Sequence, residues 1–203
     1  MSEIDPTIVK KLREKTNAGM MDCKRALQES GGDLEKAETI LRTKGIASAD
    51  KKATREAKEG VIASYIHLQG KVGVLVEINC ETDFVAKNDI FRDFVKDITL
   101  QIAASHPQVV SRDQVDAKLV EAERAIYKAQ MEGKPEAIVD KIVEGKLDKF
   151  YSGICLLEQS FVKNPDLTIK EYVSSKIAEL GENIVIKRFA RYMVGEETAS
   201  QSV

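Results

Sequence analysis

Residues 71–80, KVGVLVEINC, alternate with a period of two, and this pattern constrains the fold of the chain more than any other. One face of the segment carries five small or branched apolar side chains, at Val72, Val74, Val76, Ile78 and Cys80. Such alternation predicts a half-buried β-strand whose apolar face lies against a core. The preceding segment 61–68, VIASYIHL, is joined to it by the tight turn QGK, so the two segments are predicted to form an antiparallel hairpin.

Helical patterns follow this hairpin. Apolar residues at helical spacing predict a helix through residues 91–102, and they are Phe91, Phe94, Val95, Ile98 and Ile102. The pattern S-x-x-Q at 111–114 is typical of a capping box for a long helix, and GKP at 133–135 would end this helix and start another. Two helices joined by so short a turn run antiparallel, so residues from about 111–150 are predicted to form a projecting helical hairpin.

The last ordered elements are predicted to be a helix and a strand. The pattern T-x-x-E at 168–171 caps a helix that Gly181 stops, and NIVIKRFARYMV at 183–194 is typical of a third strand. Residues 60–195 are therefore expected to form an α+β core, in which a small antiparallel sheet has helices on one side. Residues 196–203 are expected to be a flexible tail.

Three short helices are predicted before the first strand. Asp5 can cap the first helix, Asp33 can cap the third, and Gly45 is expected to end it. Residues 1–45 should thus form a small three-helix bundle, whose limited core favours a binding role over a catalytic one. The small and charged residues 46–59 are expected to form a linker.

Composition excludes several classes of protein. The net charge is −2 over 203 residues, so no overall field attracts nucleic acid or anionic lipid, and 43% hydrophobic residues suffice for a folded, soluble chain. Cys23, Cys80 and Cys155 are odd in number and lack CxxC spacing, which favours a reducing cytoplasm over a disulfide scaffold. No segment is long and apolar enough to span a membrane, and the N-terminus resembles neither a signal nor a transit peptide, which favours the bacterial cytoplasm.

The residues that could carry chemistry do not form a catalytic pattern. His67 and His106 have no partner at metal-ligand spacing, so neither a metal site nor a cofactor is expected. The segment GKVG at 70–73 lies in a hairpin turn and not before a helix, which argues against phosphate binding. Cys80 could be a nucleophile, but a small buried hydrophobic residue is the simpler interpretation. The basic stretch 51–58 lacks aromatic residues and alternates with alanine and glutamate, as a solvated linker does. The residues therefore indicate a binding protein and not an enzyme.

Three long motifs resemble the elongation factor Ts family of bacteria and organelles. They are LREKTNAGMMDCKRAL at 12–27, TDFVAKN at 82–88 and EGKPEAIVDKIVEGKLDKF at 132–150, in the order and separation typical of the family. The resemblance implies a guanine-nucleotide exchange factor for elongation factor Tu, which it would bind in both the GDP-bound and the nucleotide-free state. It also implies that the three-helix bundle is of the ubiquitin-associated type and that the hairpin is the coiled-coil module of the family.

The chain departs from the longer family members in one respect. Those members carry two related α/β core subdomains, whereas this chain has room for one. The resemblance to shorter members implies that a homodimer, or a two-to-two complex with elongation factor Tu, supplies the missing contacts.

The resemblance assigns a role to the segment that follows the second strand. Thr82, Asp83, Phe84 and Val85 would dislodge Mg²⁺ from the nucleotide site of the partner, and Lys87 and Asn88 would add contacts. Phe84 would act as a wedge at a rigid strand end, while Asp83 would redirect groups that hold the metal. In the alternative interpretation, Phe84 packs under its own sheet and Asp83 caps the next turn.

The N-terminal motif is expected to contribute a second contact with the partner. Lys10, Arg13, Met20 and Met21 match family positions that touch the nucleotide-binding domain of elongation factor Tu. Lys10 and Arg13 share a helix face, and exposed methionines suit adaptable interfaces. At least one of the two methionines is expected to pack inside the bundle.

Two other classes of function are compatible with the residues alone. One is an adaptor that binds ubiquitin-like or peptide ligands with its bundle and oligomerises through its hairpin. The other is a hydrolase that uses Cys80 as its nucleophile.

Overall fold

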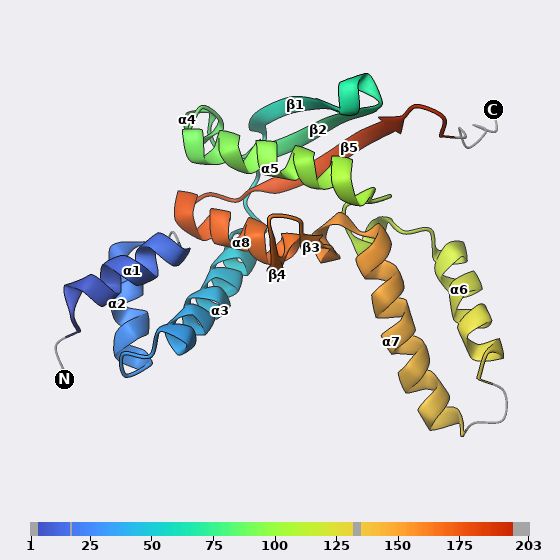
Figure 1. The fold of residues 1–203 in the computed structure, drawn as a ribbon, viewed down its shortest axis with the longest axis horizontal. Helices are drawn as coiled ribbons and strands as arrows, with labels where there is room; N and C mark the ends of the chain where they lie inside the picture. The colour runs from blue at the N-terminus through green and yellow to red at the C-terminus, as the bar shows by residue number, and fades with distance from the viewer. Residues whose placement is uncertain (1–3, 17, 132–134, 197–203) are drawn as a thin grey trace. The chain divides into compact units, whose positions relative to one another are not determined.

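The computed structural model describes residues 4–16, 18–131 and 135–196, which form an α+β fold with eight α-helices and five strands (Figure 1). The α-helices are α1 (Pro6–Thr16), α2 (Met20–Glu29), α3 (Leu34–Lys52), α4 (Asp83–Ala86), α5 (Asp89–Ser105), α6 (Ala117–Ala129), α7 (Glu136–Ile154) and α8 (Ile169–Leu180). The strands are β1 (Glu59–His67), β2 (Val72–Cys80), β3 (Ser160–Phe161), β4 (Asn164–Thr168) and β5 (Val185–Met193). No helix within these ranges is both long enough and apolar enough to cross a membrane.

The chain divides into two compact units, and both are discontinuous in sequence. The first comprises residues 1–61, 78–95 and 170–185, and the second comprises the rest. The first unit contains α1–α4, α8 and the start of α5. The second contains the hairpin of α6 and α7, the end of α5 and most of the three-stranded sheet.

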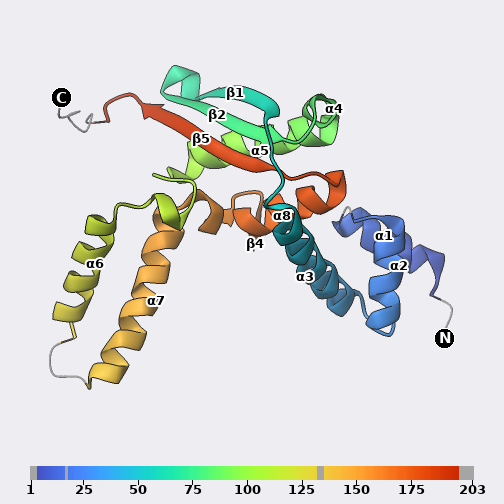
Figure 2. The same cartoon turned by 180° about the vertical axis from the view of Figure 1, so that it is seen from behind.

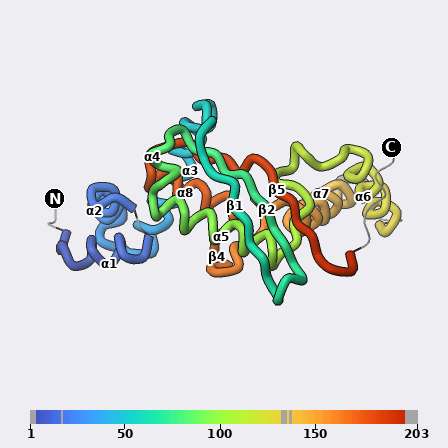
Figure 3. The backbone as a smooth tube through the Cα atoms, turned by 90° about the horizontal axis from the view of Figure 1, so that it is seen from above, coloured from blue at the N-terminus to red at the C-terminus, as the bar shows by residue number. Residues whose placement is uncertain are grey.

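The predicted sheet is present, with the strand order β1-β2-β5 (Figure 3). Burial along β2 follows the predicted alternation, because Val72, Val74, Val76, Ile78 and Cys80 are all buried while the intervening residues are not. Helix α5 runs along one face of the sheet (Figures 1 and 2), and Arg191 of β5 donates to the carbonyl oxygen of Ala103 in this helix at 3.5 Å. The small β3-β4 pair was not predicted.

The N-terminal bundle forms with the predicted caps. The Asp5 carboxylate accepts from the Thr7 amide at 2.9 Å, and the Asp33 carboxylate accepts from the Lys36 amide at 3.1 Å. The small core that α1–α3 share consists of Val9, Leu12, Cys23, Ala26, Leu27 and Ala37. The sequence NAG at 17–19 is also expected to break the first helix, and its first residue, Asn17, lies outside the described residues.

The prediction that the third helix ends at Gly45 is wrong, because α3 continues to Lys52 and takes up half of the expected linker. Gly45 is buried, and a β-carbon built on it would lie 4.0 Å from the carbonyl oxygen of Ser174 in α8. A β-carbon at this distance would be in ordinary contact, so the space beside Gly45 would also accept an alanine. Contacts with α8 on both sides of Gly45 support the continuation: Arg42 pairs with Glu171 at 3.7 Å, and Lys52 donates to the Ile177 carbonyl at 3.5 Å.

The helical hairpin is present but begins later than predicted. Asp116 caps α6 by accepting from the Lys118 amide, whereas Ser111 precedes a short 3-10 turn and does not cap a helix. The Gln114 side chain accepts from the Val110 amide at 2.9 Å, so the predicted capping box does not form. Two residues of the predicted turn GKP, Gly133 and Lys134, lie outside the described residues, and so do residues 197–203 of the expected tail 196–203. The first residue of that tail, Glu196, is described and pairs with Arg191 at 2.5 Å.

Ion pairs link the two helices of the hairpin along their sides. Arg124 pairs with Glu144 at 2.6 Å, and Lys128 pairs with Asp140 at 3.5 Å. None of the α6 side chains is fully buried, and α7 buries Val143 and Leu147. The hairpin therefore has a narrow apolar seam between charged faces, as its sequence predicts.

Two glycines should respond in opposite directions to the same substitution. Gly60 has φ +139°, and an added β-carbon would lie 2.2 Å from the Ile78 carbonyl oxygen, whereas a β-carbon on Gly145 of α7 meets no atom within 4 Å. Gly60→Ala should lower the free energy of unfolding by about 2 kcal/mol or more. Gly145→Ala should raise it by about 0.5–1 kcal/mol, because alanine favours a helix interior. Urea titrations followed by circular dichroism measure both, and a neutral Gly60→Ala would contradict the close packing of β1 on β2.

Candidate functional site

The segment Thr82–Asn88 begins where the buried face of β2 ends. Cys80 is the last residue of β2 and is fully buried. Its thiol donates to the carbonyl oxygen of Thr82, with 3.2 Å between the sulfur and the oxygen. The path of the chain beyond the strand is therefore fixed by its last core residue.

The segment forms a one-turn helix, α4, and not the strand end that was predicted. Thr82 caps this helix, since its Oγ1 atom accepts from the Val85 amide at 3.3 Å. Val85 and Ala86 are buried, so the turn has an inner side and an outer side. Phe84 lies on the outer side with 77% of its surface exposed. The structure thus contradicts the alternative in which Phe84 packs under its own sheet.

The charged residues of α4 pair with each other. The Lys87 ammonium donates to the Asp83 carboxylate at 2.7 Å, and both side chains are exposed. This hydrogen bond and the lysine charge lower the pKa of Asp83 and raise the pKa of Lys87. Asp83 does not cap the next turn, because Thr82 has that role, and it is a carboxylate at neutral pH.

Asn88 ends the segment and starts the next helix. Its Oδ1 atom accepts from the Ile90 amide at 2.8 Å, and its carbonyl accepts from the Arg92 amide at 3.0 Å. Asn88 was predicted to contact the partner, and in the structure it caps α5. It therefore fixes the end of the segment, as Thr82 fixes the start.

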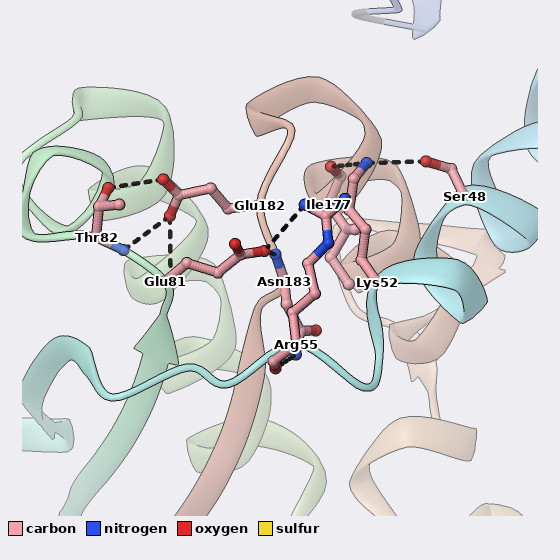
Figure 4. A network of polar contacts seen from close by, with 8 residues as sticks. All are labelled: Ser48, Lys52, Arg55, Glu81, Thr82, Ile177, Glu182 and Asn183. Atoms are coloured by element: carbon pink, nitrogen blue, oxygen red, sulfur yellow. Dashed lines mark hydrogen bonds and ion pairs between the residues drawn. The ribbon is translucent and has the colours of Figure 1, made fainter.

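A glutamate from the turn after α8 holds the start of the segment (Figure 4). The Glu182 carboxylate accepts from the amides of Glu81 and Thr82 at 3.1 and 3.0 Å through Oε2. Its Oε1 accepts from the Thr82 hydroxyl at 2.6 Å. One side chain thus satisfies three donors at the point where the strand becomes a helix.

The contact is reciprocal between the two chain segments (Figure 4). The Glu81 carboxylate accepts from the Asn183 amide at 2.6 Å and lies 3.5 Å from the Arg55 guanidinium. The Asn183 side chain, itself buried, donates to the Arg55 carbonyl at 2.8 Å. Three segments distant in sequence are therefore joined around Glu81 and Glu182.

Sequence reasoning missed Glu182, Glu81, Asn183 and Arg55. Glu182 and Thr82 are 100 residues apart, and the pattern around Glu182 indicates only the end of a helix at Gly181. The single available signal was an acidic residue directly before a predicted strand. Such a residue is usually solvated, so the local pattern could not identify it.

The N-terminal candidate residues are all exposed on α1 and α2. Met20 is 45% exposed and Met21 is 64% exposed, so the prediction that one methionine packs inside the bundle is wrong. Cys23 and Leu27 fill the core in their place. Lys10 and Arg13 are also exposed, and Lys10 lies 3.8 Å from Glu14 one turn away. These residues lie on α1 and α2, which are separate elements from α4 within the first unit.

No catalytic or metal centre forms among the residues that the structure describes. No three His, Cys, Asp or Glu side chains in these ranges lie close enough together to hold a metal ion. His67 hydrogen-bonds to Tyr65, and His106 lies 3.5 Å from Glu196. Burial, with the nearby Glu182 charge, raises the pKa of Cys80 to about 11, which is unsuitable for a nucleophile.

Comparison with known proteins identifies relatives over almost the whole chain. Residues 9–196 match the family model described as Elongation factor TS. The chain is 57% identical over 200 residues to elongation factor Ts of Carboxydothermus hydrogenoformans, which covers 98% of this chain and 92% of the relative. It is 55% identical over 194 residues to that of Thermodesulfovibrio yellowstonii (95% and 97% covered) and 60% identical over 191 residues to that of Acetivibrio thermocellus (93% and 89%).

The buried thiol provides a test of the site geometry. Because its pKa is about 11 in the folded protein, Cys80 should react with iodoacetamide at pH 8 about a hundredfold more slowly than an unfolded thiol. The raised pKa also stabilises the fold fully below about pH 9, and this contribution is lost as the pH rises toward 11. Peptide mapping by mass spectrometry measures the reaction at Cys80. A rate equal to that in urea would show that the end of β2 is open to solvent.

Proposed function

The chain belongs to the elongation factor Ts family and is thus a guanine-nucleotide exchange factor for elongation factor Tu in translation, and we propose that α4 is the part that opens the nucleotide site of the partner. It has no reaction of its own and acts by binding. Nothing in this role requires a cofactor, and we place the protein in the cytoplasm, where translation takes place.

Exchange requires only a difference in binding. The factor must bind nucleotide-free elongation factor Tu more tightly than the GDP complex. The coupling is reciprocal, so whatever weakens GDP binding by a given factor weakens binding of the exchange factor equally when a nucleotide returns. A surface that competes with the Mg²⁺ and nucleotide contacts of the partner meets this requirement.

The observation that carries the proposal is the exposure of Phe84 on a fixed turn. Its neighbours Val85 and Ala86 are buried, and Thr82 caps the turn, so the ring is presented to solvent by a rigid backbone. An exposed aromatic ring loses little rotamer entropy on binding and fills a pocket well, as interface anchors do. Phe84 would insert between elements of the partner and displace them.

Asp83 supplies a charge beside this wedge. Its carboxylate is ionised and already pairs with Lys87, so the two can exchange partners when they meet polar groups of elongation factor Tu. Mg²⁺ is held by oxygen ligands and bound water, which a carboxylate can redirect. Together with Thr82 and Val85, which position the turn, Asp83 and Phe84 would dislodge the metal.

We assign the other parts of the chain to docking. The bundle of α1–α3 acts as a ubiquitin-associated-type domain, and its exposed Met20, Met21, Lys10 and Arg13 form the first contact with the partner. The hairpin of α6 and α7 is the coiled-coil module. Residues 1–45 and 60–195 then have separate tasks, recognition and opening.

We also propose that the protein works as a homodimer or a two-to-two complex. The face of the sheet opposite the buried side of β2 carries exposed apolar side chains in the second unit, at Ile62, Ile66, Leu75 and Tyr192. Gly73 lies beneath Ile66, since a β-carbon there would be 3.4 Å from the Ile66 Cδ1 atom. A second copy would cover these four side chains, since exposed apolar side chains gathered on one face are typical of protein–protein contact sites.

Phe84→Ala should separate exchange from stability. The melting temperature should stay within about 1 °C, because an exposed ring leaves no cavity, while the stimulated release of fluorescent GDP from elongation factor Tu should fall about tenfold or more. The neighbouring Val85→Ala is the matched contrast, since it removes buried atoms and should cost about 1–2 kcal/mol of stability with a smaller loss of exchange. Unfolding by Phe84→Ala would refute the wedge.

Chelation separates the roles of Asp83 and Phe84 in the same assay. Asp83→Ala should slow GDP release, and its defect should shrink when EDTA removes Mg²⁺. Phe84→Ala should keep more of its defect under EDTA, because a wedge also moves protein elements. An Asp83→Ala defect that EDTA leaves unchanged would show that Asp83 acts by another route than the metal.

Light scattering tests the dimer. Leu75→Lys places a charge in the apolar face and should convert a dimer at tens of micromolar into a monomer. Ile138→Lys on α7 is the control, since Ile138 and Leu75 are each 51% exposed. A wild-type protein that is strictly monomeric, both alone and as a one-to-one pair with elongation factor Tu, would contradict the proposal.

A further inference from the structure

We infer that Glu182 is a positioning residue for exchange, which acts by fixing the orientation of α4 and so of Phe84. The inference rests on the proposed role of Phe84. It is carried by the contacts that Glu182 makes with Glu81 and Thr82 (Figure 4). Glu182 lies on the turn after α8, outside both β2 and the segment Thr82–Asn88.

The hydrogen bonds at this junction allow one orientation of the Thr82 hydroxyl group. The Thr82 hydroxyl has one hydrogen, which it donates to Glu182 Oε1 at 2.6 Å. A lone pair of the same oxygen is then directed to the Val85 amide, which it caps at 3.3 Å. Without the carboxylate, the hydroxyl can rotate and donate to other acceptors, and the amides of Glu81 and Thr82 lose their acceptor. The cap of α4 therefore depends on Glu182.

A helix as short as α4 cannot hold its own shape. Its four residues form one turn, and an isolated turn is unstable in water. Val85 and Ala86 anchor its inner side, while the direction of its outer side is set by how the chain leaves β2. Glu182 fixes that exit point at two successive amides, and hydrogen bonds to a charged acceptor are the stronger kind.

The same junction connects α4 with the end of α3. Lys52 donates to Ser48 at 2.9 Å and to the Ile177 carbonyl of α8 at 3.5 Å. Arg55, just beyond α3, contacts Glu81 and accepts from Asn183 through its carbonyl. The turn that carries Glu182 is thus fastened to the helix that leads from the N-terminal bundle (Figure 4).

Order in α4 can be measured without the partner. Amide ¹⁵N relaxation should give order parameters of about 0.85 for residues 82–87 in the free wild-type protein. In the free Glu182→Gln variant the same residues should give values below about 0.6. Glutamine keeps the size of the side chain but loses the charge that strengthens the bonds to the two amides, and its NH2 group cannot accept the Thr82 hydroxyl proton. Glu56→Gln is the matched control, because it removes the same charge from an exposed side chain of the same unit and should leave both order and exchange unchanged.

Exchange kinetics then show whether the order matters. In Glu182→Gln the maximal rate of GDP release should fall about fivefold or more, and the concentration for half-maximal rate should change less than twofold, because docking through the bundle is intact. In a Phe84→Ala background the same substitution should have little further effect, since residues that act through one group are not additive. A parallel melting curve identifies any loss through unfolding.

The outcomes decide between the explanations. Loss of order with a rate defect that disappears in the Phe84→Ala background supports the inference. Unchanged order parameters in Glu182→Gln overturn it, whatever exchange shows, and so does an equal defect with and without Phe84. If Phe84→Ala itself exchanges normally, the wedge fails, while the relaxation data still report whether Glu182 orders α4.

Discussion

The burial of one face of β2 is the constraint on which the rest of the structure depends. Alternate side chains of this strand are buried up to Cys80, so the strand has a fixed register and a fixed end. The chain must leave the sheet at that point, and every residue of α4 takes its direction from it. A shift of one residue would move Phe84 to the buried position of Val85 in one direction, or Val85 to the exposed position of Phe84 in the other. The surface that we propose for contact with the partner therefore depends on the register of the core strand.

A protein that promotes nucleotide exchange by binding needs a contact surface that keeps its shape while the partner changes conformation. Phe84 is exposed, yet the backbone that presents it is held on both sides, by Thr82 at its start and by Asn88 at its end. Two carboxylates, Glu81 and Glu182, complete this support by bonding to each other's chain segments. These supports are hydrogen bonds to backbone amides and hydroxyls, several of them to charged acceptors, which are the stronger kind.

Much of the fold could be predicted from local patterns, and the failures share a physical cause. Asp5 and Asp33 cap helices as expected, because a cap depends on a few adjacent residues. Gly45 does not end α3, because contacts of α3 with α8 on both sides of it, at Arg42 and Lys52, outweigh its poor helix propensity. Ser111 does not form the predicted capping box, because the Gln114 side chain accepts from the Val110 amide instead. Whether Phe84 was buried could not be decided from its neighbours, and Glu182 could not be identified at all, since its partners are 100 residues away.

The hairpin of α6 and α7 has a consequence for how this chain can change in length. The two helices are joined along their sides largely by charge pairs in water, such as Arg124 with Glu144, and α6 contributes no fully buried side chain. Pairs of this kind add little stability each, so whole helical turns outside the buried positions Val143 and Leu147 can be gained or lost without opening a cavity. The length of the hairpin can thus vary among related proteins. An insertion directly after β2 would instead disrupt the contacts of Glu81 and Thr82 with Glu182.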